Sequence, residues 1–224
     1  MTKHIQIAID GPAAAGKSTI AKKTAEKLGY TYIDTGAMYR ALSYKALETG
    51  IHLDNGEALA ELLGAMTIML KQVGGKQTVL ADNEDVTEAI RSQEVTNSVS
   101  KVAAHEAVRR LMVQKQQELA QDGGVVMDGR DIGTAVLPNA ALKIFMTASV
   151  KERAERRFKE NETRGIDTSL AALEAEIEAR DQADSSRAVS PLKQADDAIL
   201  LDTTAMTIEE VAAKIDRFAK ERLA

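Results

Sequence analysis

The stretch Gly11-Pro12-Ala13-Ala14-Ala15-Gly16-Lys17-Ser18 matches the pattern G-x-x-x-x-G-K-[ST] at every fixed position. It follows an apolar run at residues 5–10 that predicts a short buried strand, and it precedes a helical pattern at 19–28 that Gly29 closes. A strand, a glycine-rich loop and a helix place backbone N–H groups around an anion. In this motif the lysine reaches the β- and γ-phosphates, and the serine hydroxyl binds Mg²⁺. The sequence therefore predicts a nucleoside triphosphate and Mg²⁺ as ligands, with Ser18 binding the metal.

The composition limits the class of protein. The 224 residues carry a net charge of −5 and 3% aromatic residues, so neither a basic surface nor base-stacking platforms favour nucleic-acid binding. The absence of cysteine excludes disulfides and thiol chemistry. Because the chain lacks an apolar run of membrane-spanning length and enters a strand almost at once, we expect no signal peptide, no membrane contact and a cytoplasmic location.

Apolar segments alternate with helical patterns along the chain. Strands are predicted at residues 5–10, 31–34, 125–128, 142–147 and 198–202, and helices at 36–48, 105–121 and 208–222. Short apolar strands separated by helices predict an α/β protein with a parallel sheet covered on both faces. Ligands of such sheets bind at the carboxyl ends of the strands. Capping-box patterns at 149–152 and 207–210 predict two helix starts.

One segment breaks this alternation. Strand patterns at 66–73 and 77–81 are joined through Gly74-Gly75, and residues 82–85 suggest a further turn. These features predict an antiparallel inserted subdomain at about 63–103, and an irregular crossover is the alternative.

Two acidic motifs follow predicted strands. Asp34 precedes Thr35 and Gly36, and its carboxylate can accept a proton or hold Mg²⁺ through water; a helix N-cap is the alternative, and Thr35 can also cap that helix. Asp128 ends an apolar strand before Gly129-Arg130-Asp131, as a second Mg²⁺-linked acid does in this class of fold. A turn with a local ion pair is the alternative there.

Arginines form two further groups. Arg153, Arg156, Arg157 and Arg164 are spaced to share one face of a helix, which predicts a lid that brings arginines onto a transferring phosphoryl group. Acidic neighbours leave a solvated, salt-bridged helix as the alternative.

Arg180, Asp184 and Arg187 have i, i+4, i+7 spacing, which predicts a common helix face. Alone such a trio is a surface ion-pair ladder. Arg40, Arg109 and Arg130 also lie beyond strand ends or on flanking helices, and converging guanidinium groups favour a second, phosphate-bearing ligand.

Four motifs are similar to those of the bacterial cytidylate kinases, in the nucleoside monophosphate kinase group of P-loop proteins. They are Ile9-Asp10-Gly11-Pro12 with Gly16-Lys17-Ser18, Asp34-Thr35-Gly36-Ala37-Met38-Tyr39-Arg40, Asp128-Gly129-Arg130-Asp131-Ile132-Gly133-Thr134, and Arg187-Ala188-Val189-Ser190-Pro191-Leu192. The resemblance covers nearly the whole chain. It implies a three-layer α/β/α P-loop fold with a five-stranded parallel sheet. The core domain would comprise 1–62 and 104–224, with a helical lid at about 151–167 and a small antiparallel NMP-binding insertion at 63–103.

The resemblance also implies an activity, in which a monomeric enzyme of pyrimidine nucleotide metabolism transfers the γ-phosphoryl group of ATP to CMP or dCMP with Mg²⁺. Motifs and resemblance together assign catalytic roles to Lys17, Asp34, Asp128, Arg153 and Arg157. ATP is expected to bind Gly11, Pro12, Ala13, Ala14, Ala15, Gly16, Lys17, Ser18 and Thr19. The acceptor is expected to bind Thr35, Tyr39, Arg40, Arg109, Arg130, Asp131, Arg180, Asp184 and Arg187.

Within the acceptor set, the resemblance places Thr35 on the cytosine side and Asp131 at the cytosine amino group. It places Arg180 and Asp184 at the sugar hydroxyls and directs Arg187 to phosphate. Two alternatives stay open from the residues alone. One is a P-loop kinase for another small acceptor, such as UMP, AMP or shikimate. The other is a nucleotide-dependent switch, although the sequence lacks the Asn-Lys-x-Asp motif that would support guanine recognition.

Overall fold

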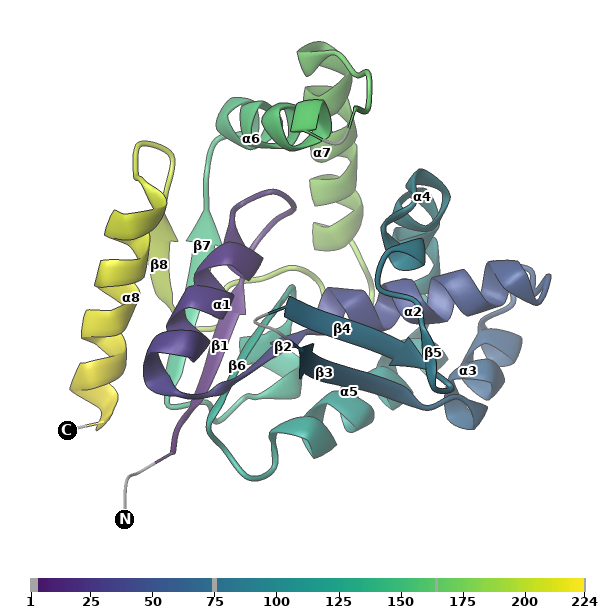
Figure 1. Cartoon of the computed structure of the whole chain (residues 1–224), viewed down its shortest axis with the longest axis horizontal. Helices are drawn as coiled ribbons and strands as arrows, with labels where there is room; N and C mark the ends of the chain where they lie inside the picture. The colour runs from purple at the N-terminus through teal and green to yellow at the C-terminus, as the bar shows by residue number, and fades with distance from the viewer. Residues whose placement is uncertain (1–3, 74–75, 164, 224) are drawn as a thin grey trace. The chain divides into compact units, whose positions relative to one another are not determined.

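A computed structural model describes residues 4–73, 76–163 and 165–223, and Figure 1 labels its helices and strands. The chain forms two compact units. The first comprises Met1–Tyr32 with Asp122–Ala224, and the second comprises Ile33–Gln121.

The main sheet confirms the predicted α/β architecture. Its strands are β1 (Gln6–Asp10), β2 (Thr31–Asp34), β6 (Val125–Gly129), β7 (Leu142–Thr147) and β8 (Ile199–Asp202), in the order β2-β6-β1-β7-β8. β1 pairs in parallel with β6 on one side and β7 on the other, and β7 pairs in parallel with β8. The strand order therefore reverses at β1, and the crevice beyond its carboxyl end is where such sheets bind ligands.

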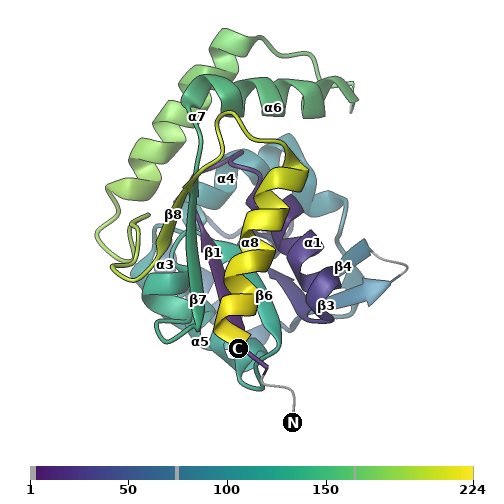
Figure 2. The ribbon, with the colours of Figure 1, turned by 90° about the vertical axis from the view of Figure 1, so that its left-hand side faces the viewer.

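Helices of the first unit cover this sheet and extend beyond it. They are α1 (Lys17–Leu28), a π-helix (Ile132–Val136), α6 (Val150–Thr163), α7 (Leu170–Ser185) and α8 (Ile208–Leu223). α1 and α8 pack side by side on one face, over a core that includes Ile7, Ile144 and Ile215 (Figure 2). α6 and α7 pack on each other beyond the carboxyl ends of β1 and β7 (Figures 1 and 2).

The second unit combines helices with the predicted antiparallel patch. Its elements are α2 (Thr35–Glu48), α3 (Gly56–Ala65), β3 (Ile68–Val73), β4 (Lys76–Ala81), β5 (Glu84–Asp85), a 3₁₀ helix (Ala89–Arg91), α4 (Gln93–Val102) and α5 (Glu106–Ala120). The strands form one antiparallel sheet in the order β3-β4-β5. The predicted Gly74-Gly75 turn lies outside the described residues.

Local details of this patch differ from the sequence prediction. β3 begins at Ile68 and not at Met66, because the Met66 N–H donates to the Leu62 carbonyl and closes α3. The predicted turn at 82–85 is shorter: Asp82 and Asn83 both have positive φ, as a two-residue hairpin turn requires, and β5 follows at once.

The second unit also extends on both sides of residues 63–103. One hydrophobic core joins Met38 and Leu42 of α2, Leu63 of α3, Met112 of α5 and Val79 of β4. Because these helices bury their apolar faces together with the antiparallel sheet, they form one compact body with it.

Candidate active site

The phosphate loop, residues 11–18, connects β1 to α1 and begins with a close backbone contact. Gly11 has φ +149, and a Cβ there would lie 2.0 Å from the Met146 carbonyl oxygen of β7, so only glycine fits. Ala14 and Gly16 have φ of 58 and 86, which turns the chain into α1 without a side-chain cap. The first N–H groups of α1 therefore stay available to an anion.

Lys17 is the cation of this loop. Its side chain is buried, and its Nζ donates to the Pro12 carbonyl at 2.7 Å, which holds the ammonium group against the loop. Burial, followed by the positive charge of Arg130, lowers the pKa of Lys17 to about 7, although Asp128 and Asp10 oppose the shift. A phosphate anion beside this lysine would favour its charged form.

Ser18 and Asp128 meet although they are 110 residues apart. The Ser18 hydroxyl donates to Asp128 Oδ2 at 2.8 Å, and the Tyr32 hydroxyl donates to Asp128 Oδ1 at 2.7 Å. Sequence reasoning missed Tyr32, because an aromatic residue in an apolar strand has the same pattern as a core residue. The structure thus fixes the carboxylate of Asp128 from both sides.

The Ser18–Asp128 pair fits Mg²⁺. Hydroxyl and carboxylate oxygens are ligands that this hard cation prefers, and P-loop proteins hold Mg²⁺ with this pair of residue types. Across the described part of the chain, no three acidic, histidine or cysteine side chains gather into a metal-binding group. Mg²⁺ at this place would therefore take most of its ligands from water and substrate phosphates, as it commonly does.

Asp10, at the end of β1, is a buried acid that sequence reasoning left outside the site. Its two carboxylate oxygens accept the N–H groups of Ile132 and Gly133, both at 2.7 Å. Burial raises the pKa of Asp10 to about 6, in spite of these hydrogen bonds and the charge of Lys17. Through its two hydrogen bonds, Asp10 connects the segment after Asp131 to the start of the phosphate loop.

Replacing Asp10 with asparagine should change how stability depends on pH. Since the folded-state pKa is above the ordinary value of 3.8, Asp10 contributes stability at pH 4 that is lost as the pH rises through 6. Asparagine does not titrate, so the free energy of unfolding of Asp10→Asn relative to the wild type should increase by up to about 3 kcal/mol between pH 4 and 7. Urea unfolding across that range measures the difference. The exposed Asp202 is the control: hydrogen bonds from Thr204 lower its pKa below 3.8, so its titration lies largely below this range and Asp202→Asn should change little between pH 4 and 7.

Arg130, Asp184 and Arg187 form an ion-pair cluster in the first unit. Arg130 Nε donates to Asp184 Oδ2 at 2.8 Å, and Arg187 Nη2 lies 3.5 Å from Asp184 Oδ1. Burial alone would raise the pKa of Asp184, but the charges of Arg130 and Arg187 lower it below its usual range. This acid is therefore ionised and orients two arginines.

The predicted helix face for this cluster was wrong in one respect. α7 ends at Ser185, so Arg187 lies beyond the helix and reaches back, donating Nε to the Asp184 carbonyl at 3.2 Å. Arg180, on α7, acts electrostatically on both Asp184 and Lys17. Asp131 is buried next to Arg130, and its charge raises the pKa of Asp10. Residues predicted for the donor and the acceptor thus share one electrostatic environment within the first unit.

The second unit holds the other predicted acceptor residues. Asp34, not Thr35, is the N-cap of α2: its Oδ1 accepts from the Ala37 N–H at 2.8 Å and its Oδ2 from Arg40 at 3.0 Å. Burial favours a higher pKa for Asp34, but Arg40 and the Ala37 hydrogen bond lower it. The contacts of Asp34 are those of an ionised N-cap that orients Arg40.

Three more residues complete this set. Thr35 is the first residue of α2 and is buried, as is Tyr39 one turn later. Arg109, on α5, is buried; it lies 5.6 Å from the Tyr39 ring centre and donates to the Ala103 carbonyl. The second unit thus gathers Asp34 with Arg40 and Tyr39 with Arg109.

The arginines of α6, which were predicted to share one helix face, have different surroundings. Arg153 is buried, and its guanidinium donates to the carbonyls of Ala148 and Ala13 and pairs with Asp181 at 2.7 Å. Arg157 instead pairs along the helix with Glu160 at 3.2 Å. Arg164 lies outside the described residues.

Thr19, predicted to bind ATP, is exposed in the first turn of α1.

A phosphate loop with buried Lys17, a serine–aspartate pair suited to a divalent cation and clustered arginines fits a nucleotide-dependent phosphotransferase. The family model described as cytidylate kinase matches residues 7–221. The chain therefore belongs to the cytidylate kinase family and is a nucleoside monophosphate kinase.

Individual relatives agree with this family. The chain is 60% identical over 223 residues to a cytidylate kinase of Lysinibacillus sphaericus (strain C3-41), covering 100% of both chains. It is 58% identical to a cytidylate kinase of Anoxybacillus flavithermus (strain DSM 21510 / WK1), covering 100% of this chain and 99% of the relative. A crystal structure of an uncharacterized protein from Eubacterium ventriosum ATCC 27560 matches the fold with a TM-score of 0.53 at 12% identity, over 98% of this chain and 99% of that one.

Within residues 4–73, 76–163 and 165–223, every helix falls short of the length or the apolar character that a bilayer span demands.

Proposed function

We propose that the chain transfers the γ-phosphoryl group of ATP to CMP or dCMP, giving ADP and CDP or dCDP, with the residues of its two units in the roles described below. The contact between Ser18 and Asp128 next to buried Lys17 carries the donor half of this proposal. Family membership supports the acceptor half.

On the donor side, the N–H groups of the phosphate loop and Lys17 bind the phosphates of ATP. Ser18 and Asp128 would hold Mg²⁺, which when bound would offset part of the phosphate charge. Arg153 and Arg157 of α6 are assigned to the charge that develops on the transferring group. Since phosphoryl transfer needs alignment and charge stabilisation more than covalent help, these residues suffice without a nucleophilic side chain.

In the transfer step, a phosphate oxygen of the acceptor forms a bond to the γ-phosphorus while the bond to the β,γ-bridging oxygen breaks and ADP leaves. The acceptor brings a second group of negative charges close to ATP. Arg130 and Arg187 are assigned to the acceptor phosphate and base side, and Arg180 with Asp184 to the sugar hydroxyls; Asp184 also orients Arg130 and Arg187. Asp131 is assigned to the cytosine amino group.

In the second unit, Thr35, Tyr39, Arg40 and Arg109 keep the acceptor roles that the family resemblance implies. Asp34 holds Arg40 in place, and this contact is the basis for assigning it an orienting role in the reaction. We keep residues 63–103 as the NMP-binding insertion, 1–62 with 104–224 as the core and about 151–167 as the lid. We further propose that the protein is a cytoplasmic monomer and that it binds neither nucleic acid nor membranes.

A panel of nucleoside monophosphates assayed with ATP and Mg²⁺ tests this function. CMP and dCMP should support ADP formation at much higher kcat/KM than UMP, AMP, GMP or shikimate. ATP turnover that does not depend on an added monophosphate would contradict the proposal.

Asp131→Asn should reduce base discrimination. A carboxylate accepts a hydrogen bond from the cytosine amino group, whereas an amide can also donate to the carbonyl of uracil. Because a mismatched buried polar group costs roughly 1–3 kcal/mol, the CMP/UMP ratio of kcat/KM should fall about tenfold. Glu162→Gln, an exposed charge on α6, serves as the matched control and should leave the ratio unchanged. An unchanged ratio in Asp131→Asn would remove its role as base reader.

A further inference from the structure

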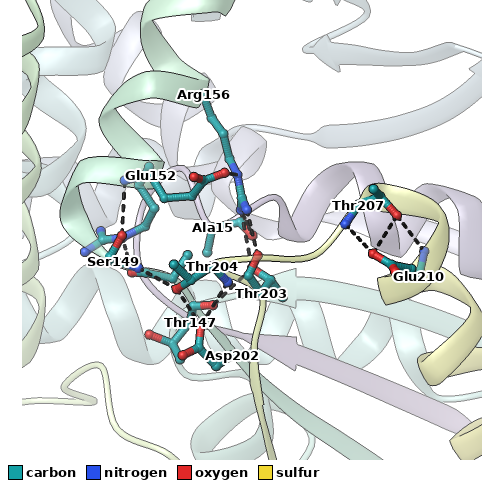
Figure 3. Close-up of polar contacts among 12 residues, drawn as sticks. Ala15, Thr147, Ser149, Glu152, Arg156, Asp202, Thr203, Thr204, Thr207 and Glu210 are labelled. Carbon is teal, nitrogen blue, oxygen red and sulfur yellow. Dashed lines mark hydrogen bonds and ion pairs between the residues drawn. The ribbon is translucent and has the colours of Figure 1, made fainter.

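Two consecutive threonines after β8 fasten the start of α6 (Figure 3). Thr203 is 1% exposed, and both its N–H and its hydroxyl donate to the Thr147 carbonyl at the end of β7, at 2.8 and 3.0 Å. The Thr204 hydroxyl oxygen accepts from the N–H of Ser149, directly before α6, at 3.1 Å. The segment 203–204 therefore closes the end of the β7–β8 pair and meets the first turn of α6.

Arg156, two turns into α6, joins three segments with one guanidinium (Figure 3). Its Nη2 donates to the Thr203 carbonyl at 2.8 Å. Its Nη1 lies 3.3 Å from the Thr203 hydroxyl and 3.4 Å from the Ala15 carbonyl of the phosphate loop. Its Nε donates to Glu152 at 3.1 Å. A planar guanidinium engaged on all three nitrogens has a fixed orientation.

The same contacts correct a sequence prediction. The Ser149 hydroxyl accepts the Glu152 N–H at 3.2 Å, but the Glu152 carboxylate binds Arg156 instead of returning to the Ser149 N–H. The predicted capping box at 149–152 is therefore only half formed, and the Ser149 N–H goes to Thr204. The Ser149 N–H at the start of α6 is therefore bonded to the loop after β8 and not to a side chain of α6.

That loop is held at both ends. Thr204 donates its N–H and hydroxyl to Asp202 Oδ1 at 2.9 and 2.6 Å. At the other end, Thr207 and Glu210 form a complete capping box at the start of α8, with reciprocal bonds of 2.8 and 3.2 Å. Arg156 thus binds a restrained support and not a free loop.

We propose that Arg156 and Thr203 are positioning residues, which fix α6 relative to the phosphate loop so that Arg153 and Arg157 meet the transferring phosphoryl group. This inference rests on the proposed function. Arg153 donates to the Ala13 carbonyl while Arg156 reaches Ala15, so two carbonyls of the loop face α6. Because a displacement of about 1 Å can cost as much as 10²-fold in rate, the orientation of α6 bears directly on kcat.

Thr203→Val and Thr203→Ser test the proposal on the full chain. Valine keeps the shape and the N–H bond to Thr147 but loses the hydroxyl, whereas serine keeps the hydroxyl. We expect Thr203→Val to lower kcat for CMP phosphorylation about tenfold with KM for CMP within about twofold of wild type. Thr203→Ser, which keeps the hydroxyl, should retain most of the wild-type kcat. A valine variant with wild-type kcat would overturn the proposal, whereas a wild type inactive on CMP would instead overturn the proposed function.

Thr207→Val is the matched control. It removes a threonine hydroxyl from the same loop, at the capping box of α8, where that hydroxyl donates to the Glu210 carboxylate and accepts from the Glu210 N–H. This variant should melt at a lower temperature than wild type and keep its kcat. An equal loss of kcat in Thr207→Val and Thr203→Val would show a general loss of structure and overturn the inference.

Combining Thr203→Val with Arg156→Lys separates positioning from direct phosphate binding. Lysine keeps the charge but cannot reproduce the forked contact. If the two residues act as one unit, the double variant should be within about twofold of the worse single variant in kcat. Multiplying losses would mean that Arg156 acts on the nucleotide independently of Thr203, contrary to the proposal.

Discussion

Replacing Lys17 with methionine should lower kcat for CMP phosphorylation by about 10³-fold or more, a loss comparable to removing a cation that stabilises the transferring phosphoryl group. Lys17 is buried and held by Pro12, so it meets the phosphates with its orientation already set. Steady-state kinetics with CMP measure the effect. Lys17→Arg keeps the charge and should retain more activity than Lys17→Met. A loss smaller than tenfold in Lys17→Met would contradict the assigned role.

The same residue should link ATP binding to proton uptake. Burial and the neighbouring arginine lower the pKa of Lys17 to about 7, and bound phosphates should raise it again. Above pH 7, binding of ATP should therefore take up a proton, and affinity should weaken as the pH rises. Calorimetry at pH 8 in buffers of different ionisation enthalpy measures this uptake. The uptake should be reduced in Lys17→Met, and equal uptake in both proteins would assign it to another group.

Replacing Asp128 with asparagine should lower kcat by about 10²-fold and weaken apparent Mg²⁺ affinity by about 10- to 100-fold. The amide removes a negative charge next to Ser18 and cannot accept from both hydroxyls on equal terms. Mg²⁺ titrations of the rate and calorimetric titration of Mg²⁺ with ATP present give two independent readouts.

Tyr32→Phe is the matched control for Asp128→Asn. It removes one hydrogen bond from the same carboxylate while leaving its charge and the contact with Ser18 in place. It should therefore reduce Mg²⁺ affinity less than Asp128→Asn does. Wild-type Mg²⁺ affinity in Asp128→Asn would exclude Asp128 from the metal site.

Local sequence signals predicted most of the fold. β2 and β7 have the predicted bounds, because short apolar runs between polar residues define strands clearly. α1 ends before Gly29 as predicted, since a left-handed glycine there closes the helix. α8 begins at Ile208 as predicted, whereas the starts of α1, α2 and α5 differ from the prediction by one or two residues. Such starts depend on which side chain takes the orphan N–H groups of the first turn.

The site was less predictable than the fold. The motifs pointed to both Ser18 and Asp128, but their contact and the part played by Tyr32 depend on how strands align. A helix was expected to continue to Arg187, although α7 ends at Ser185. Arg153 and Arg156 both donate to backbone carbonyls. Since every residue has a backbone carbonyl, the amino-acid sequence does not indicate which carbonyl an arginine will contact.

The close approach of Gly11 to β7 restricts residue 11 to glycine whether or not a nucleotide is bound. A methyl group at residue 11 would collide with the Met146 carbonyl at 2.0 Å, and this oxygen belongs to a neighbouring strand and not to a ligand. The first glycine of the nucleotide-binding pattern is therefore dictated by the spacing between two strands. A variant of this chain that no longer bound any nucleotide would still need glycine at residue 11 to keep β7 at this distance.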